Sequence, residues 1–352
     1  MEQQAKFAFD KQTSNMLKGV FLILMFCLHF FCFPSWYVES VTLPQTAFME
    51  NMQGHFQICV AGFAFLTGFF YNYTKEKTFK YTFRKWIDFL IPYWFILILF
   101  LIIGLVTKTY SFTFSGFALE VLALRRSIMN FCWYVPFYII SMLALFILTK
   151  LFKNKTLLIL IFGVAAPIIV YYGAGYIGLL SNGILNEILE KFQVFFPISA
   201  AGYAVSNWKL FEKADKLKIN NYIRAIIGVV LVVIVFFEPT WLYYFDKGFV
   251  FKVAIKLIRI ASIPFFVYGL IQMFNVFANW IKKPFEVIGK YSLLMWFVHC
   301  IFFNCSAKIF QPTLYFSGIP IVILLEGILI CLAVSFVMNY PVNFIKKIAF
   351  NR

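Results

Sequence analysis

Six ionisable side chains lie inside long apolar stretches of this sequence. An uncompensated charge in such a stretch is costly, so these positions are candidates for function. In chain order they are Lys18, His29, Lys256, Arg259, His299 and Glu326. Imidazole titrates near neutrality, so a histidine in a hydrated cavity is well suited to take a proton from a substrate. His29 and His299 are therefore the candidate general bases.

The spacing of these residues suggests how they are arranged. Lys18 and His29 are eleven residues apart, which is about three helical turns, so both project from one helix face about 16 Å apart. His299 lies as deep in its apolar stretch as His29 does. In the orientation derived below, Lys256, Arg259 and Glu326 fall in the outer halves of their stretches. All six could therefore converge on one polar cavity that opens outward.

A structural interpretation of the same residues stays open. Either histidine could simply hydrogen-bond a neighbouring helix. Lys256 and Arg259 could extend their charged ends to the membrane interface, with Glu326 as their structural partner.

The amino-acid composition indicates a membrane protein, so these six residues lie within a lipid bilayer. Of 352 residues, 62% are hydrophobic and 13% are charged, whereas a soluble domain has about 25% charged residues. The net charge of +16 does not indicate nucleic acid, because lysines and arginines occur in short clusters between apolar stretches. We predict the lipid bilayer as a partner and no nucleic acid. Seven cysteines show no zinc-binding spacing, so no metal is predicted.

The predicted fold is all-α, a polytopic helical membrane bundle of about ten transmembrane helices in one domain, 1–352. A span needs about 20 predominantly apolar residues. The segments that qualify are 16–36, 55–73, 87–107, 131–149, 156–175, 192–206, 221–237, 253–272, 286–303 and 319–339.

Lysines and arginines predict the orientation of the bundle. They concentrate in alternate loops and at the C-terminus, at 75–85, 150–155, 209–218, 282–283 and 346–352, and are sparse in the opposite loops. By the positive-inside rule, both termini are cytoplasmic. We expect a multi-pass protein of the cell membrane, in which the charged loops at 74–85 and 207–220 are solvated anchors.

The stretches at 17–31, 63–71, 80–94 and 288–303 together resemble the acyltransferase-3 family, membrane enzymes that acylate cell-surface carbohydrates. LKGVFLILMFCLHFF at 17–31 resembles the family's first helix, in which ten residues separate a basic residue from a histidine. FAFLTGFFY at 63–71 resembles the second helix, and KYTFRKWIDFLIPYW at 80–94 the basic entry to the third. IGKYSLLMWFVHCIFF at 288–303 resembles the late helix with glycine, serine and histidine.

This resemblance implies a membrane O-acetyltransferase that moves an acetyl group from cytoplasmic acetyl-CoA to a hydroxyl of a surface polysaccharide or lipid-linked sugar. Acetyl-CoA is a co-substrate, and no permanently bound cofactor is expected. Arg84, Lys85 and Lys80 form a basic entrance for its phosphates, and His29 is the base. The family's Arg-x-x-Arg is incomplete, because Ile87 stands where the second arginine is usual.

A transporter is the alternative function. Charges within the spans, together with glycine and proline interruptions, would also suit an exporter of a glycan or lipid-linked sugar. Acetyl transfer distinguishes the two functions, because an exporter performs no acyl chemistry.

Overall fold

The computed structural model describes residues 9–41, 43, 46–74, 76–243, 249–303 and 306–350. Within these residues the chain forms helices and no strand, which confirms the predicted helical membrane bundle. Positions 75 and 352 of the basic clusters lie outside the described residues.

The helices are α1 (Lys11–Phe31), α2 (Thr46–Asn51), α3 (Gln53–Phe56), α4 (Ile58–Asn72), α5 (Phe79–Val106), α6 (Phe114–Val121), α7 (Tyr134–Leu151), α8 (Thr156–Tyr176), α9 (Gly183–Asn207), α10 (Leu210–Asp215), α11 (Asn221–Phe236), α12 (Glu238–Tyr243), α13 (Phe249–Val276), α14 (Asn279–Lys290), α15 (Ser292–Val298), α16 (Ala307–Leu314) and α17 (Pro320–Phe350). Short 3-10 helices are η1 (Pro34–Trp36), η2 (Asn130–Trp133), η3 (Leu179–Ser181) and η4 (His299–Phe302).

Each predicted span falls on one of these helices or on a helix pair. In the described chain, 7 helical stretches are long and apolar enough to cross a membrane, or up to 8 if the bent pair α14–α15 is one span. The two remaining predicted spans fall on α9, which carries Glu187, Glu190 and Lys191 in its first half, and on α11, which has only 16 residues. The count of ten and the orientation stay predictions.

The ninth predicted span, 286–303, is not one straight helix. α14 and α15 meet at an angle of 62°. Gly289 and Ser292 flank the break, and glycine and serine near one another are a common cause of sharp helix kinks.

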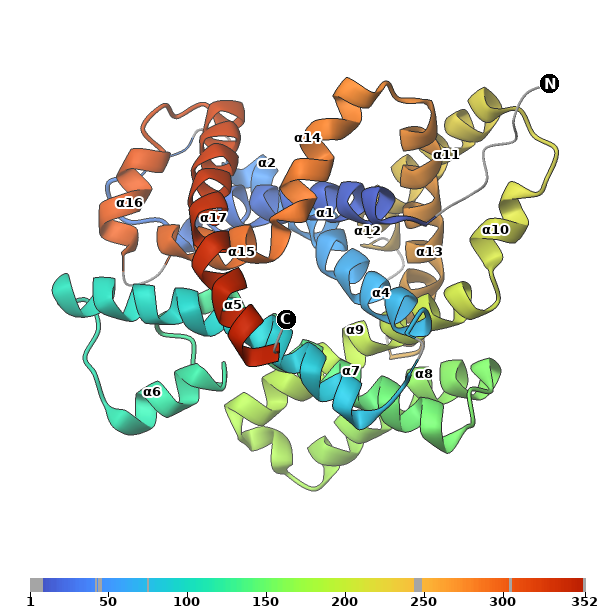
Figure 1. Cartoon of the computed structure of the whole chain (residues 1–352), viewed down its shortest axis with the longest axis horizontal. Coiled ribbons are helices and arrows are strands. Elements are labelled where there is room, and N and C mark those ends of the chain that lie inside the picture. The colour runs from blue at the N-terminus through green and yellow to red at the C-terminus, as the bar shows by residue number, and fades with distance from the viewer. Residues whose placement is uncertain are drawn as a thin grey trace.

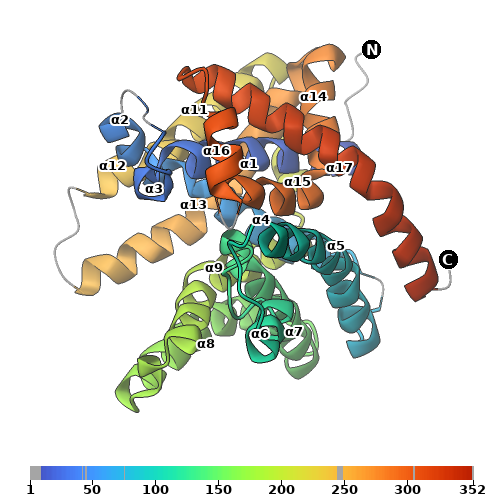
Figure 2. The ribbon, with the colours of Figure 1, turned by 90° about the vertical axis from the view of Figure 1, so that its left-hand side faces the viewer.

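α1 is the central helix of the bundle. In its apolar window 72% of the residues are buried, against 22% for α8, and Figure 2 shows α1 near the centre with α8 at the edge. Phe21, Phe26 and Phe30 of α1 are fully buried. The first candidate base, His29, is thus carried by the helix with the most protein around it.

Glycines bring α1 and α14 into backbone contact (Figure 1). A Cβ at Gly289 would lie 1.7 Å from the carbonyl oxygen of Asn15, and one at Gly19 would lie 2.2 Å from that of Phe285. Any larger residue must therefore separate the two helices. This contact fixes the start of the bent pair that carries His299 against the helix that carries His29.

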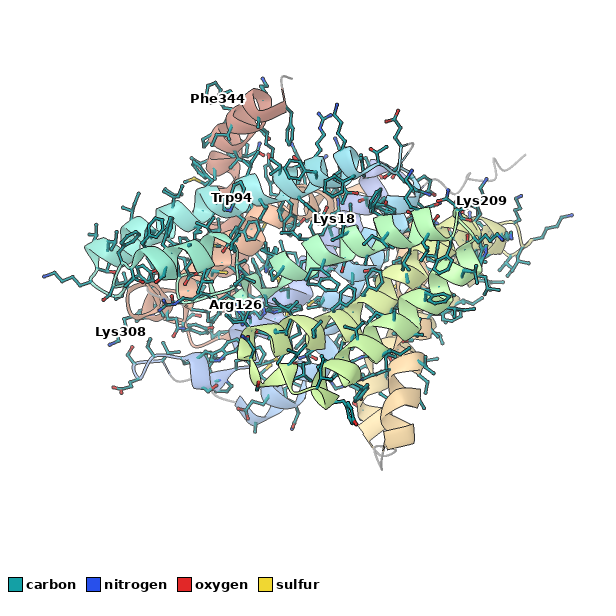
Figure 3. All side chains as sticks on the ribbon, turned by 90° about the horizontal axis from the view of Figure 1, so that it is seen from below. Lys18, Trp94, Arg126, Lys209, Lys308 and Phe344 are labelled. Carbon is teal, nitrogen blue, oxygen red and sulfur yellow. The ribbon has the colours of Figure 1, made fainter. Side chains whose placement is uncertain are left out.

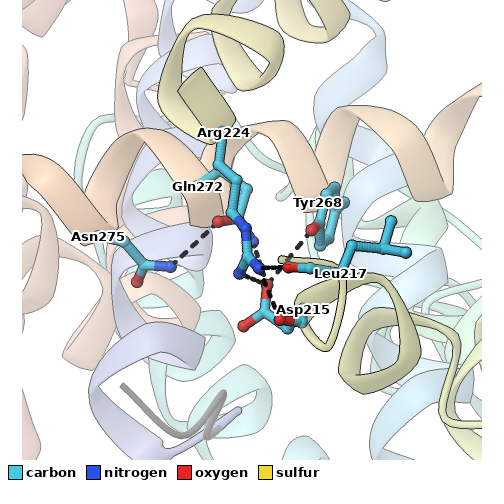
Figure 4. A network of polar contacts seen from close by, with 6 residues as sticks. All are labelled: Asp215, Leu217, Arg224, Tyr268, Gln272 and Asn275. Atoms are coloured by element: carbon cyan, nitrogen blue, oxygen red, sulfur yellow. Dashed lines mark hydrogen bonds and ion pairs between the residues drawn. The ribbon is translucent and has the colours of Figure 1, made fainter. Parts of the chain in front are cut away.

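A polar network ties the α10–α11 loop to α13 (Figure 4). Arg224 pairs with Asp215 at 3.1 Å, and Asp215 accepts hydrogen bonds from Tyr268 and Gln272 at 3.3 and 3.0 Å. The side chains of Arg224 and Asp215 are only 13% and 10% exposed. The lysines of the predicted anchor at 207–220, Lys209, Lys213, Lys216 and Lys218, are exposed, whereas Asp215 of the same segment is packed against α13.

Candidate active site

A cavity of about 630 Å³ lies between α1, α4, α5, α7 and the α14–α15 bend. At one end, which we call the lysine end, its lining includes Lys11, Lys18, Lys85 and Lys290. At the other end, the histidine end, the lining includes His29, Phe131 and Trp133. Apolar side chains from α4, α5 and α7 line the middle, including Phe63, Leu66, Phe89 and Met142.

The lysine end carries excess positive charge. Two carboxylates, Asp10 and Asp88, also line it, but both are engaged. Asp10 caps α1 by accepting from the Thr13 N–H at 2.8 Å, and Asp88 pairs with Lys346 of α17 at 2.9 Å. The lysines at this end are therefore suited to bind a polyanion.

At the histidine end the two candidate bases meet. Nδ1 of His29 lies 2.8 Å from Nε2 of His299, and the rings are nearly parallel, with an interplanar angle of 9°. His299 is fully buried and His29 is 7% exposed. Of the two, only His29 lines the cavity. His299 therefore lies behind His29 as its partner.

The hydrogen bonds of the pair define its tautomers. Nδ1 of His299 bonds the backbone carbonyl of Trp296. A carbonyl only accepts, so this nitrogen carries the proton, and in a neutral His299 Nε2 holds a lone pair. That lone pair accepts from Nδ1–H of His29. Nε2 of His29 is then the basic nitrogen, left to take a proton from a substrate in the cavity.

Phe131 fixes the plane of the His29 ring. Their centroids are 3.9 Å apart and the planes differ by 16°. Phe131 follows a loop anchored by Glu120 of α6, whose carboxylate accepts from the N–H groups of Ser127 and Ile128 at 2.8 and 3.3 Å. Burial raises the pKa of the Glu120 carboxyl, although these hydrogen bonds oppose the shift.

One comparison with known proteins identifies the family of the chain. A family model described as an acyltransferase domain matches residues 13–340. The chain belongs to the acyltransferase-3 family. The predicted resemblance is confirmed, and the protein is a multi-pass membrane acyltransferase. The comparisons with curated proteins and with solved structures found no match.

Of the three residues predicted to bind the phosphates of acetyl-CoA, one lines the cavity and two do not. Lys85 lines the lysine end together with Lys18, the basic residue of the first-helix motif. Arg84 is exposed, with its guanidinium 4.9 Å from the centre of the Phe350 ring. Lys80 is also exposed, and neither Arg84 nor Lys80 lines the cavity.

The other charged residues predicted within the spans do not join the site. Lys256 donates to Gln193 of α9 at 3.2 Å, and Arg259 donates to the Gly54 carbonyl at 3.1 Å. Glu326 is half-buried on α17 and does not line the cavity. The prediction of one cavity shared by all six is wrong, since Lys256, Arg259 and Glu326 serve helix contacts or lie elsewhere.

Sequence reasoning did not single out several residues of the site. Phe131, Trp133 and Trp296 were overlooked because an aromatic side chain in an apolar stretch carries no signal of its own. The position of Trp296, three residues before His299, places its carbonyl within reach of the imidazole in one helical turn. In the described residues no group of three or more His, Cys, Asp or Glu side chains could hold a metal ion.

Proposed function

We propose that this acyltransferase is an O-acetyltransferase of the cell membrane, which moves the acetyl group of acetyl-CoA to a hydroxyl of a surface polysaccharide or lipid-linked sugar. The observation that carries the proposal is the single cavity that joins a cluster of lysines to a buried histidine pair. The lysine end, predicted to face the cytoplasm, would bind the phosphates of acetyl-CoA. The apolar middle would hold the arm that carries the thioester.

His29 would act as general base at the far end of the cavity. Its Nε2 takes the proton from the sugar hydroxyl while the hydroxyl oxygen forms a bond to the acetyl carbon. The bond between that carbon and the CoA sulfur then breaks. The departing thiolate then takes this proton from His29. The products are the thiol of CoA and the acetyl ester of the sugar, and His29 is neutral again. His299 accepts from Nδ1–H throughout and stabilises the protonated ring.

Surface polysaccharide from cells with and without this gene tests the proposal. Mild base releases O-linked acetyl groups, which are then measured per sugar. We expect acetate to fall on deletion and to return when the wild-type gene is restored. An exporter without acyl chemistry would instead change the amount of surface glycan at constant acetylation, and that result would overturn the proposal.

A further inference from the structure

A second, very small space lies against the histidine end of the cavity. Its volume is about 10 Å³, and its lining includes Arg126, Glu187 and Lys191. Among the described residues, Trp133 is the one that lines both this space and the main cavity. Trp133 therefore lies where the two spaces meet.

Trp133 is held in place by groups from α9. Its ring stacks on Phe195, with centroids 5.6 Å apart and planes at 27°, and Nζ of Lys191 lies 5.6 Å from its centre. Arg126 donates from both terminal nitrogens to the two carboxylate oxygens of Glu187. Both residues line the small space, and their side chains are 23% and 31% exposed, so the pair lies partly at the surface.

The small space lies at the opposite end of the bundle from the lysines. α5 begins beside the lysine end, where Lys85 and Asp88 line the cavity, and its 28 residues carry the chain across to the segment that contains Arg126. Figure 3 shows Lys209 and Lys308 at opposite ends of the molecule, with Lys18 and Arg126 between them. A ligand that enters past Arg126 thus reaches His29 from the side opposite to acetyl-CoA.

The chemistry of this entrance suits a sugar. An indole face packs against the C–H groups of a pyranose ring, while a guanidinium, a carboxylate and an ammonium offer hydrogen bonds to its hydroxyls. Each of these groups already has a partner inside the protein, so a sugar would replace existing contacts.

We propose that this space is the acceptor entrance and that Trp133 is its gate. With Trp133 against Phe195 and Lys191 the entrance is closed. When the indole moves aside, the entrance and the cavity join, and a sugar hydroxyl reaches Nε2 of His29. This inference rests on the proposed function for the identity of the ligand, but the gate itself can be tested without acyl chemistry.

Side-specific labelling tests the gate. His29→Cys is placed in a variant whose native cysteines are replaced, and the protein is reconstituted in vesicles of one orientation. The probe is a charged methanethiosulfonate, added to either side. We expect labelling from the Lys209 side with or without Trp133. From the Lys308 side, Trp133→Ala should raise the rate about tenfold, which corresponds to about 1.4 kcal/mol. Trp280→Ala, at an exposed position of α14, is the matched control.

Equal labelling from both sides with Trp133 intact, or unchanged labelling from the Lys308 side in Trp133→Ala, would overturn the gate. A second measurement uses the chain with its own cysteines, with acetyl-CoA on the Lys209 side and glycerol as the acceptor probe on the other. Trp133→Ala should acetylate glycerol faster than wild type, and Trp133→Phe should resemble wild type. Absence of acetyl transfer in every protein, wild type included, would contradict the proposed function while the labelling still decides the gate.

Discussion

His29 and His299 are 270 positions apart in the chain, and their imidazoles share a hydrogen bond of 2.8 Å. The contact joins the helix at the centre of the bundle to the end of the bent pair α14–α15. Only one ring nitrogen of the pair, Nε2 of His29, is left as a base toward the cavity. The arrangement therefore assigns different tasks to two histidines that the sequence places at the same depth.

We expect His29→Gln to lose acetyl transfer while folding normally. Glutamine keeps some hydrogen bonding but cannot carry a proton, so kcat should fall by about 10²–10⁴-fold. Transfer from radiolabelled acetyl-CoA by reconstituted protein measures the effect. His55→Gln is the matched control, since His55 lies on α3, bonds Thr240 at 2.7 Å and does not line the cavity. Near-normal transfer by the His29 variant would show that His29 is not the general base.

Lys85→Ala should weaken the binding of acetyl-CoA more than Arg84→Ala does. Lys85 lines the cavity whereas Arg84 points to the Phe350 ring. A charge-assisted bond to phosphate contributes about 1.5–3 kcal/mol, so the KM for acetyl-CoA should rise roughly 10- to 150-fold with little change in kcat. Lys80→Ala is the control. A larger effect of Arg84→Ala than of Lys85→Ala would place the donor phosphates outside the lysine end.

The spans could be predicted because a bilayer leaves the backbone few choices. Without water, each N–H and C=O must be bonded within a helix or a closed barrel, so a long apolar stretch implies a helix. Depth follows from position along that helix, and on this basis His29 and His299 were expected at one level. The hydrogen bond between them was not predictable, since it depends on the backbone contact at Gly19 and Gly289 and on the bend after Lys290.

The partners of Lys256 and Arg259 show what sequence could not provide. Position along α13 gives their depth, but not the rotation of α13 or its neighbours. In the structure Lys256 meets Gln193 of α9 and Arg259 meets the Gly54 carbonyl. These hydrogen-bond partners are uncharged groups from distant segments, so a search of the sequence for oppositely charged pairs does not indicate them. The wrong expectation of a shared outer cavity follows from treating equal depth as proximity.

The orientation can be decided with single cysteines in a variant that otherwise contains none. Glu39 and Lys153 are both exposed and lie in loops at opposite ends of predicted spans. An impermeant thiol reagent should label Glu39→Cys in intact cells, and Lys153→Cys only after the membrane is permeabilised. The reverse pattern would place the lysine end outside the cell and exclude cytoplasmic acetyl-CoA as the donor.

Gly289→Ala should destabilise the protein. The added Cβ would lie 1.7 Å from the Asn15 carbonyl oxygen, so α1 and α14 must move apart. Overpacking of this kind costs about 1–3 kcal/mol, which should appear as a lower unfolding temperature in detergent. Gly173→Ala in α8 is the control, because nothing lies within 4 Å of a Cβ there. Equal stability of the two variants would mean that the α1–α14 contact adjusts freely.

His299 is expected to position His29 rather than to exchange a proton with the substrate. If its lone pair holds Nδ1–H of His29, replacement by leucine removes the acceptor and leaves the His29 ring free to take either tautomer. His299→Leu should lower kcat with little change in the KM for acetyl-CoA. His299→Gln should recover part of the loss, because its amide oxygen can accept the same hydrogen bond. A merely space-filling residue would be replaced as well by leucine as by glutamine.

The tautomer itself can be observed. In protein labelled with ¹⁵N-histidine, the two ring nitrogens of His29 should show one protonated Nδ1 and one unprotonated Nε2. His299→Leu should convert this pattern to a mixture, whereas His299→Gln should preserve it. His55, which lies away from the pair, serves as an internal reference in every sample. An Nδ1 of His29 without a proton in the wild type would reverse the direction of the hydrogen bond and assign the base to the other ring nitrogen.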